Sequence, residues 1–78
     1  MRIIKILWTD DEVEALKPHI FFLREKGYEI DTCSNGTDTI DLVRRNQYDL
    51  IFLDENMPGL SGIETLKLIK EEGLIVRL

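Results

Sequence analysis

The sequence predicts an α/β fold in which a doubly wound parallel sheet carries helices on both faces. Short apolar runs typical of strands alternate three times with segments whose apolar residues recur at helical spacing. The connections between them are short, which favours right-handed crossovers and parallel strands. With 78 residues, the chain has the size of one domain with a single hydrophobic core.

The first strand–helix unit opens with residues 3–8, which are nearly all apolar and predict a strand buried on both faces. Residues 10–12 are acidic and mark the start of a helix, where carboxylates cap free N–H groups. We expect this helix to run to Gly27, with Pro18 kinking it from inside. Its apolar stripe consists of Val13, Leu16, Ile20 and Leu23.

The second unit begins with residues 28–33, which alternate between polar and apolar side chains and predict a strand near a sheet edge. Asn35 and Gly36 predict a turn after it. A short helix through residues 40–43 is then expected to reach Gln47.

The third unit begins with residues 50–53, an apolar run that predicts a central strand leading into Asp54. Ser61 and Glu64 have the spacing of a capping box, so a third helix is expected to start near Gly62 and to end at Gly73. Residues 74–78 fit either a short fourth strand or an unrelated tail.

Three acids follow strands that should be neighbours. Asp10 and Asp11 follow the first strand, Asp54 follows the third, and ligands of such sheets bind beyond the carboxyl ends of the strands. Taken singly, each acid fits a helix cap or a turn. Clustered carboxylates repel one another unless a cation is bound, and hard oxygen ligands suit Mg²⁺. The sequence therefore predicts a magnesium site at this edge.

The composition argues against several kinds of partner and location. A formal charge of −5, with only Arg44 and Arg45 as an adjacent basic pair, disfavours direct binding to nucleic acid or to an anionic membrane. Lys5 and the acids at residues 10–12 interrupt the apolar start, so no targeting segment or membrane span is predicted. Cys33 is the only cysteine, which rules out an intrachain disulfide and favours a cytoplasmic location.

Two motifs resemble the receiver domains of two-component signalling. They are Leu-Trp-Thr-Asp-Asp-Glu at residues 7–12 and Asp-Leu-Ile-Phe-Leu-Asp-Glu-Asn-Met-Pro-Gly at residues 49–59. The resemblance implies a flavodoxin-like receiver fold with Asp54 as phosphoacceptor. It also implies Mg²⁺ held by Asp11, Asp54 and the Asn56 backbone carbonyl, with Asp10 helping through a water.

The same resemblance implies a signalling domain rather than an enzyme, with at most self-phosphorylation from small phosphodonors. Its phosphoryl donor would be a sensor histidine kinase or a phosphotransfer protein. More narrowly, residues 16–20 and 54–62 resemble receivers that precede a PglZ-type, alkaline-phosphatase-like effector domain.

The chain also departs from the family pattern. Receivers continue through two further strands and helices, with a Ser or Thr after the fourth strand and a Lys after the fifth. Lys5 cannot replace that Lys, because an extended strand places it roughly 16 Å from the acids. We therefore expect residues 1–78 to form a C-terminally truncated receiver. The alternative is a non-switching interaction or dimerisation module that self-associates through an open sheet edge.

Other functions fit the residues less well. A flavin-binding module would need hydroxyls and glycines after the first strand, where this chain has acids that repel phosphate. An aspartyl phosphatase would need a second acid two residues after Asp54, where Asn56 stands. His19 has no second histidine or cysteine nearby, so a helix-flank role is expected. Phe21 and Phe22 lie off the apolar stripe and predict lateral packing or, alternatively, a partner surface.

Overall fold

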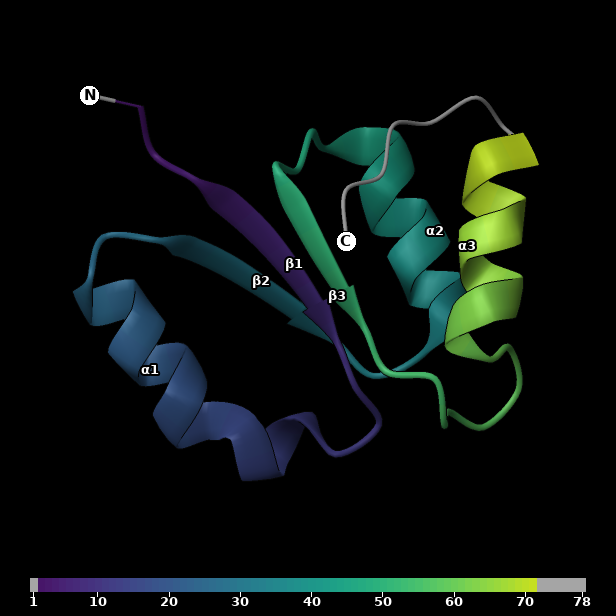
Figure 1. The fold of residues 1–78 in the computed structure, drawn as a ribbon, viewed down its shortest axis with the longest axis horizontal. Coiled ribbons are helices and arrows are strands. Elements are labelled where there is room, and N and C mark those ends of the chain that lie inside the picture. The colour runs from purple at the N-terminus through teal and green to yellow at the C-terminus, as the bar shows by residue number, and fades with distance from the viewer. Residues whose placement is uncertain (1, 72–78) are drawn as a thin grey trace.

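A three-stranded parallel sheet lies at the centre of the computed structural model, which describes residues 2–71 (Figure 1). Its strands are β1 (Lys5–Thr9), β2 (Glu29–Cys33) and β3 (Leu50–Leu53), in the order β2-β1-β3. In register, Thr9 lies opposite Cys33 on one side and Leu53 on the other, so the three strands end level with one another. This confirms the parallel sheet and the pairing of the first and third strands.

Helices cover both faces of this sheet. The chain forms a short 3₁₀ helix η1 (Val13–Leu16) and the helices α1 (Lys17–Glu25), α2 (Gly36–Arg45) and α3 (Gly62–Glu71). In Figure 1, α1 lies on one side of the strands, while α2 and α3 lie beside each other on the other side. Among the residues described, no helix is long and apolar enough to cross a membrane.

The hydrophobic core is divided by the sheet, because alternate side chains of a strand point to opposite faces. The buried cluster beneath α2 and α3 consists of Leu7, Ile40, Val43, Ile51 and Ile69. The cluster beneath α1 consists of Ile6, Ile20 and Ile30. Burying one such side chain fully stabilises a fold by about 1.5–3 kcal/mol. The two clusters therefore hold the helices against the sheet whose ends carry the acids.

The prediction of one continuous first helix with a kink at Pro18 was wrong. Pro18 lies in the first turn of α1, where its missing N–H removes no helical hydrogen bond. The residues before it form η1, whose first turn has no side-chain cap at Glu12. Proline therefore starts a new helix here. The first strand is Lys5–Thr9, so it starts two residues later and ends one residue later than the predicted range of residues 3–8.

The predicted turn at Asn35 and Gly36 was also wrong. Asn35 is the N-cap of α2, and its side-chain oxygen accepts a hydrogen bond from the Asp38 N–H at 2.8 Å. Gly36 is already the first residue of the helix. At the other end, the helix stops at Arg45, because Asn46 leaves it in an extended conformation, so the predicted end at Gln47 was two residues late.

The third unit agrees with the prediction in the bounds of its strand and in the start of its helix. The capping box is confirmed: the Glu64 N–H donates to Ser61 Oγ, and the Ser61 N–H donates to Glu64 Oε1, both at 3.1 Å. Among the described residues, β3 pairs with β1, which lies between β2 and β3, so the prediction that β3 is central in the whole sheet stays a prediction. The predicted end at Gly73 and the fourth strand at residues 74–78 lie outside the residues described.

Candidate metal and phosphoacceptor site

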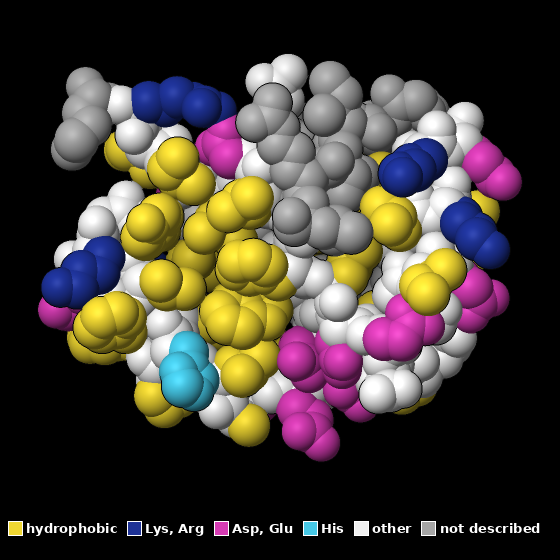
Figure 2. Space-filling model, viewed as in Figure 1, with side chains coloured by type: hydrophobic (Ala, Val, Ile, Leu, Met, Phe, Trp, Pro, Cys, Tyr) yellow, Lys and Arg dark blue, Asp and Glu magenta, His cyan; other side chains and the backbone are white. Residues whose placement is uncertain are grey.

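The three predicted acids come together at one edge of the sheet. One carboxylate oxygen from each of Asp10, Asp11 and Asp54 lies within 4.8 Å of the others. Asp10 and Asp54 are partly buried, whereas Asp11 is exposed. Figure 2 shows Asp and Glu side chains gathered below the ends of the strands. The convergence of these acids, which the sequence predicted from strand ends alone, is confirmed.

Main-chain hydrogen bonds continue the sheet past its strands and hold two of these acids. The Asp10 N–H donates to the Cys33 carbonyl at 3.1 Å, and the Asp54 N–H donates to the Thr9 carbonyl at 2.9 Å. The peptide planes that carry Asp10 and Asp54 are therefore fixed to neighbouring strands. This rigid support limits how far the acids can move apart.

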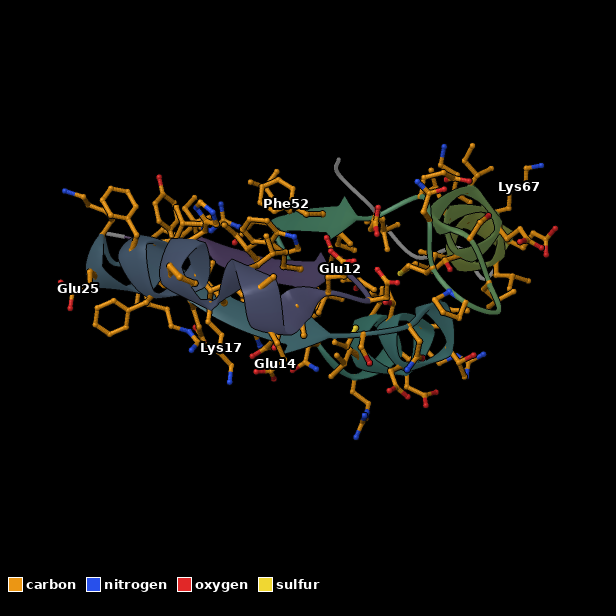
Figure 3. All side chains as sticks on the ribbon, turned by 90° about the horizontal axis from the view of Figure 1, so that it is seen from below. Glu12, Glu14, Lys17, Glu25, Phe52 and Lys67 are labelled. Atoms are coloured by element: carbon orange, nitrogen blue, oxygen red, sulfur yellow. The ribbon has the colours of Figure 1, made fainter. Side chains whose placement is uncertain are left out.

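The side-chain contacts of the acids leave oxygen atoms free for a cation. Asp10 Oδ1 accepts a hydrogen bond from the Glu12 N–H at 2.9 Å, and Asp54 Oδ1 accepts a long one from the Asn56 N–H at 3.4 Å. Figure 3 shows Glu12 beside this end of the sheet. An ionised carboxylate can accept about four hydrogen bonds or metal contacts, so each acid keeps ligand positions available.

Electrostatics at the cluster also favour a bound cation. Desolvation, followed by repulsion from Asp54 and Asp10, raises the pKa of Asp11 above its ordinary value. A divalent ion would remove the repulsive contribution. Three carboxylates that converge from two strands form an oxygen donor set that Mg²⁺ or Ca²⁺ accepts. The residues present therefore fit the predicted metal.

The loop between β3 and α3 is built tightly around Asp54. Met57 is buried, and Gly59 has a positive φ of 79°, a conformation that favours glycine. A Cβ on Gly62 would lie 2.7 Å from the Asp54 carbonyl oxygen, so only glycine fits there without a shift. The Glu55 carboxylate accepts a hydrogen bond from the Ile63 N–H at 2.9 Å and so ties the loop to α3.

These roles of Glu55 and Gly62 were missed from the sequence. The only signal in the sequence was their position, because Glu55 directly follows Asp54 and Gly62 directly follows the capping residue Ser61. Asn56, predicted to offer its carbonyl to the metal, is exposed and contacts Asp54 through its N–H.

Other residues considered from the sequence lie away from the acids. Lys5 Nζ bonds Asn46 Oδ1 at 3.2 Å, at the opposite end of β1, so it does not reach the site. His19 is exposed on α1. Phe21 and Phe22 are 64% and 59% exposed, which favours the partner surface over lateral packing, although Lys26 Nζ lies over the Phe22 ring.

The fold and site match a known family. The family model of the response regulator receiver domain matches residues 6–77. The transcriptional regulatory protein ResD of Bacillus subtilis is 40% identical over 68 residues, which cover 87% of this chain and 28% of ResD. Sporulation initiation phosphotransferase F of Bacillus subtilis is 37% identical over 68 residues, covering 85% of this chain and 53% of that protein.

Solved structures of response regulators are also similar to this chain. The response regulator protein TrrA from Thermotoga maritima, in complex with Mg(2+)-BeF, has a TM-score of 0.79 and 38% identity to this chain. The match covers 90% of this chain and 61% of that chain. A second structure shows TrrA in complex with the histidine kinase ThkA. This chain thus spans less than two thirds of the length of each of these proteins.

Proposed function

The chain belongs to the response regulator receiver domains, which are homologous to the phosphoacceptor domains of two-component systems, and we propose that Asp54 is its phosphoacceptor. Asp10, Asp11 and Asp54, with the Asn56 backbone carbonyl, would hold Mg²⁺ beside the accepting oxygen. One observation carries this proposal: three carboxylates from two strands converge within 4.8 Å, next to a loop shaped around Asp54.

The chemistry assigned to Asp54 is nucleophilic. One carboxylate oxygen attacks the phosphorus of a phosphohistidine or of a small acyl phosphate, and an oxygen–phosphorus bond forms. The bond from phosphorus to the donor atom breaks, and the donor leaves with that electron pair. Mg²⁺, when bound by these residues, would neutralise the negative charge on the oxygens of the phosphoryl group. Asp54 has two carboxylate oxygens, so one can bind the metal while the other attacks; Oδ1 also accepts the long hydrogen bond from the Asn56 N–H at 3.4 Å.

The proposed phosphoryl donor is a sensor histidine kinase or a phosphotransfer protein. The complex of TrrA with the histidine kinase ThkA supports this class of partner. A candidate contact surface lies on α1, where Pro18, Phe21 and Phe22 line a shallow pocket with both phenyl rings exposed. The short helix η1 connects Asp10 and Asp11 to α1, so this surface and two of the acids belong to the same strand–helix unit.

A second candidate function is an interaction module that self-associates. Two observations favour it: β3 has a free edge among the described residues, and Phe52 on that strand is 36% exposed. Phe52 packs edge-to-face on Trp8 with ring centroids 5.1 Å apart, and Figure 2 shows hydrophobic side chains gathered over the sheet. Two copies could pair their β3 edges around a twofold axis.

Three finer assignments complete the proposal. The motif resemblance at residues 16–20 and 54–62 supports a PglZ-type effector domain after this receiver in the full-length protein. The net charge of −5 argues against direct contact with nucleic acid. The single cysteine supports a cytoplasmic location. Intact mass of the native product would test for the effector domain.

Phosphorylation is tested by intact mass after incubation with acetyl phosphate and Mg²⁺, for the wild type and for Asp54→Asn. We expect the wild type to gain one phosphoryl group slowly and the variant to gain none. Self-phosphorylation without a kinase would thereby be measured directly. Equal labelling of the two proteins would remove Asp54 as the acceptor.

A further inference from the structure

Three small polar side chains form a buried cluster directly behind the acids. Thr9 on β1 and Thr39 on α2 are fully buried, and Cys33 on β2 is partly buried. Thr9 Oγ1 lies 2.6 Å from Thr39 Oγ1 and 3.1 Å from Cys33 Sγ, and Cys33 Sγ lies 3.2 Å from Thr39 Oγ1. Thr9 lies within the motif at residues 7–12, but no step of the proposed chemistry uses the three side chains.

The protons of this cluster can be assigned so that every group donates once. The Thr39 hydroxyl donates to the Asn35 carbonyl at 2.9 Å, so its oxygen is free to accept from the Thr9 hydroxyl. The Thr9 oxygen then accepts from the Cys33 thiol. The chain of donors runs from β2 through β1 to the N-cap of α2, and it ties three elements together without leaving a buried polar atom unpaired among the residues described.

Two members of the cluster also hold acids through the main chain. The Thr9 carbonyl accepts from the Asp54 N–H, and the Cys33 carbonyl accepts from the Asp10 N–H. Thr9 is bonded covalently to Asp10 as well. Thr9 carries Asp10 and Asp11 covalently but holds Asp54 only through one hydrogen bond, and the loop after Asp54 is also tied to α3, so a movement of Thr9 relative to α2 shifts Asp10 and Asp11 further than Asp54.

The short contact between the two threonines sets how closely β1 approaches α2. Their oxygens lie 2.6 Å apart, whereas non-bonded heavy atoms prefer about 3.5–4.0 Å. A methyl group in place of either hydroxyl could not stay this close to the other oxygen, so we expect the end of β1 to move away from α2 when the hydrogen bond is removed. Mg²⁺ needs near-ideal octahedral geometry with contacts of about 2.0–2.1 Å, while Ca²⁺ accepts longer and more irregular ones.

We propose that Thr9 and Thr39 are positioning residues that fix the spacing of the acids and so make the site selective for Mg²⁺ over Ca²⁺. This inference rests on the proposed metal site and adds its source of selectivity. A purely structural cluster would behave differently, because its loss would lower stability without changing the ratio of the two ion affinities.

The test is calorimetric titration of the whole chain with Mg²⁺ and separately with Ca²⁺. Thr9→Val keeps the shape of the side chain and removes the hydroxyl, so we expect Mg²⁺ affinity to fall about tenfold, as for other supporting residues of metal sites. Ca²⁺ affinity should change less than about threefold, since Ca²⁺ tolerates irregular geometry. Thr9→Ser keeps the hydroxyl and should therefore keep the Mg²⁺ preference of the wild type.

Two further variants keep the test decisive. Cys33→Ala leaves the Thr9–Thr39 bond intact and should keep the ion preference, whereas Thr39→Val should lose it even if Thr9→Val does not fold. Equal losses for both ions in the valine variants, or no loss, would overturn the inference. If Asp11→Asn and Asp54→Asn do not weaken Mg²⁺ binding, the metal site itself fails, which is a separate result.

Discussion

The substitution Gly62→Ala tests whether the start of α3 is pressed against the phosphoacceptor backbone. An alanine Cβ would lie 2.7 Å from the Asp54 carbonyl oxygen and 3.2 Å from both the Asp54 carbonyl carbon and Glu55 Cα. All three atoms belong to the main chain, so no side chain can rotate away. The helix start must move by at least 0.3 Å to reach the 3.0 Å below which real contacts are essentially absent.

Two opposing effects set the size of the change. Overpacking of this kind costs about 1–3 kcal/mol, and three tight contacts place Gly62→Ala in the upper half of that range. Replacing glycine by alanine in a helix returns at most about 1 kcal/mol. We therefore expect a net loss of about 1–2 kcal/mol, which lowers the melting temperature by about 4–8 °C per kcal/mol in a domain of this size.

The assay combines urea unfolding with Mg²⁺ titration, and Gly27→Ala is the matched control. Gly27 has a φ of 96°, and a Cβ added there would meet nothing within 4 Å, so alanine costs about 1–2 kcal/mol through backbone strain alone. Both variants should lose similar stability, but only Gly62→Ala should weaken Mg²⁺ binding. Wild-type stability in Gly62→Ala, or equal Mg²⁺ affinity in the two variants, would refute the reasoning.

Four further predictions concern the charge of Asp11, the N-cap of α2, the edge of β3 and the response to a phosphoryl mimic. Desolvation, followed by repulsion from Asp54 and Asp10, raises the pKa of Asp11, so without metal its charge costs stability above the raised pKa and nothing below 3.8. Asp11→Asn should therefore stabilise the metal-free protein at pH 7 but not at pH 3, and it should abolish the melting-temperature gain from Mg²⁺. An unchanged stability at pH 7 would contradict this. Asn35→Ala removes the cap of α2 and should cost about 1 kcal/mol in urea unfolding, whereas Gln47→Ala at an exposed position should cost almost nothing. Light scattering should show that the wild type is a dimer, that Phe52→Glu dissociates it, and that Phe21→Glu, on the surface of α1, leaves it intact. A monomeric wild type would exclude the β3 edge as an interface. Beryllofluoride with Mg²⁺ mimics the bound phosphoryl group, and in NMR spectra it should shift amide resonances at the acids and in the first turns of α2 and α3. Shifts that also extend along α1 would show that the conformational change reaches beyond these contacts.

Much of the site could be predicted from the sequence because it depends on strand ends. A parallel sheet brings the residues after neighbouring strands to one edge, so Asp10, Asp11 and Asp54 needed only the strand order to be placed together. The capping box at Ser61 was equally local, and both of its hydrogen bonds form. In each case the positions are fixed by backbone periodicity and chain connectivity rather than by detailed packing.

The errors concern positions where two local preferences compete. Pro18 fits both the inside of a kinked helix and the first turn of a new one, and the structure takes the second because the missing N–H then costs nothing. Asn35 followed by glycine is typical of a turn, yet asparagine is also a strong N-cap, and the amphipathic stretch behind it decides in favour of the helix.

The buried cluster of Thr9, Cys33 and Thr39 was not predictable, because its members come from three separate elements and only tertiary packing brings them together. Its place in the fold gives the site a second set of supports. Thr9 connects the acids to α2, and Glu55 with Gly62 connects Asp54 to α3. The two helices in turn lie against each other. We therefore expect a change in charge at Asp54 to move α2 and α3 more than α1, because the core contacts of α1 lie on the opposite face of the sheet.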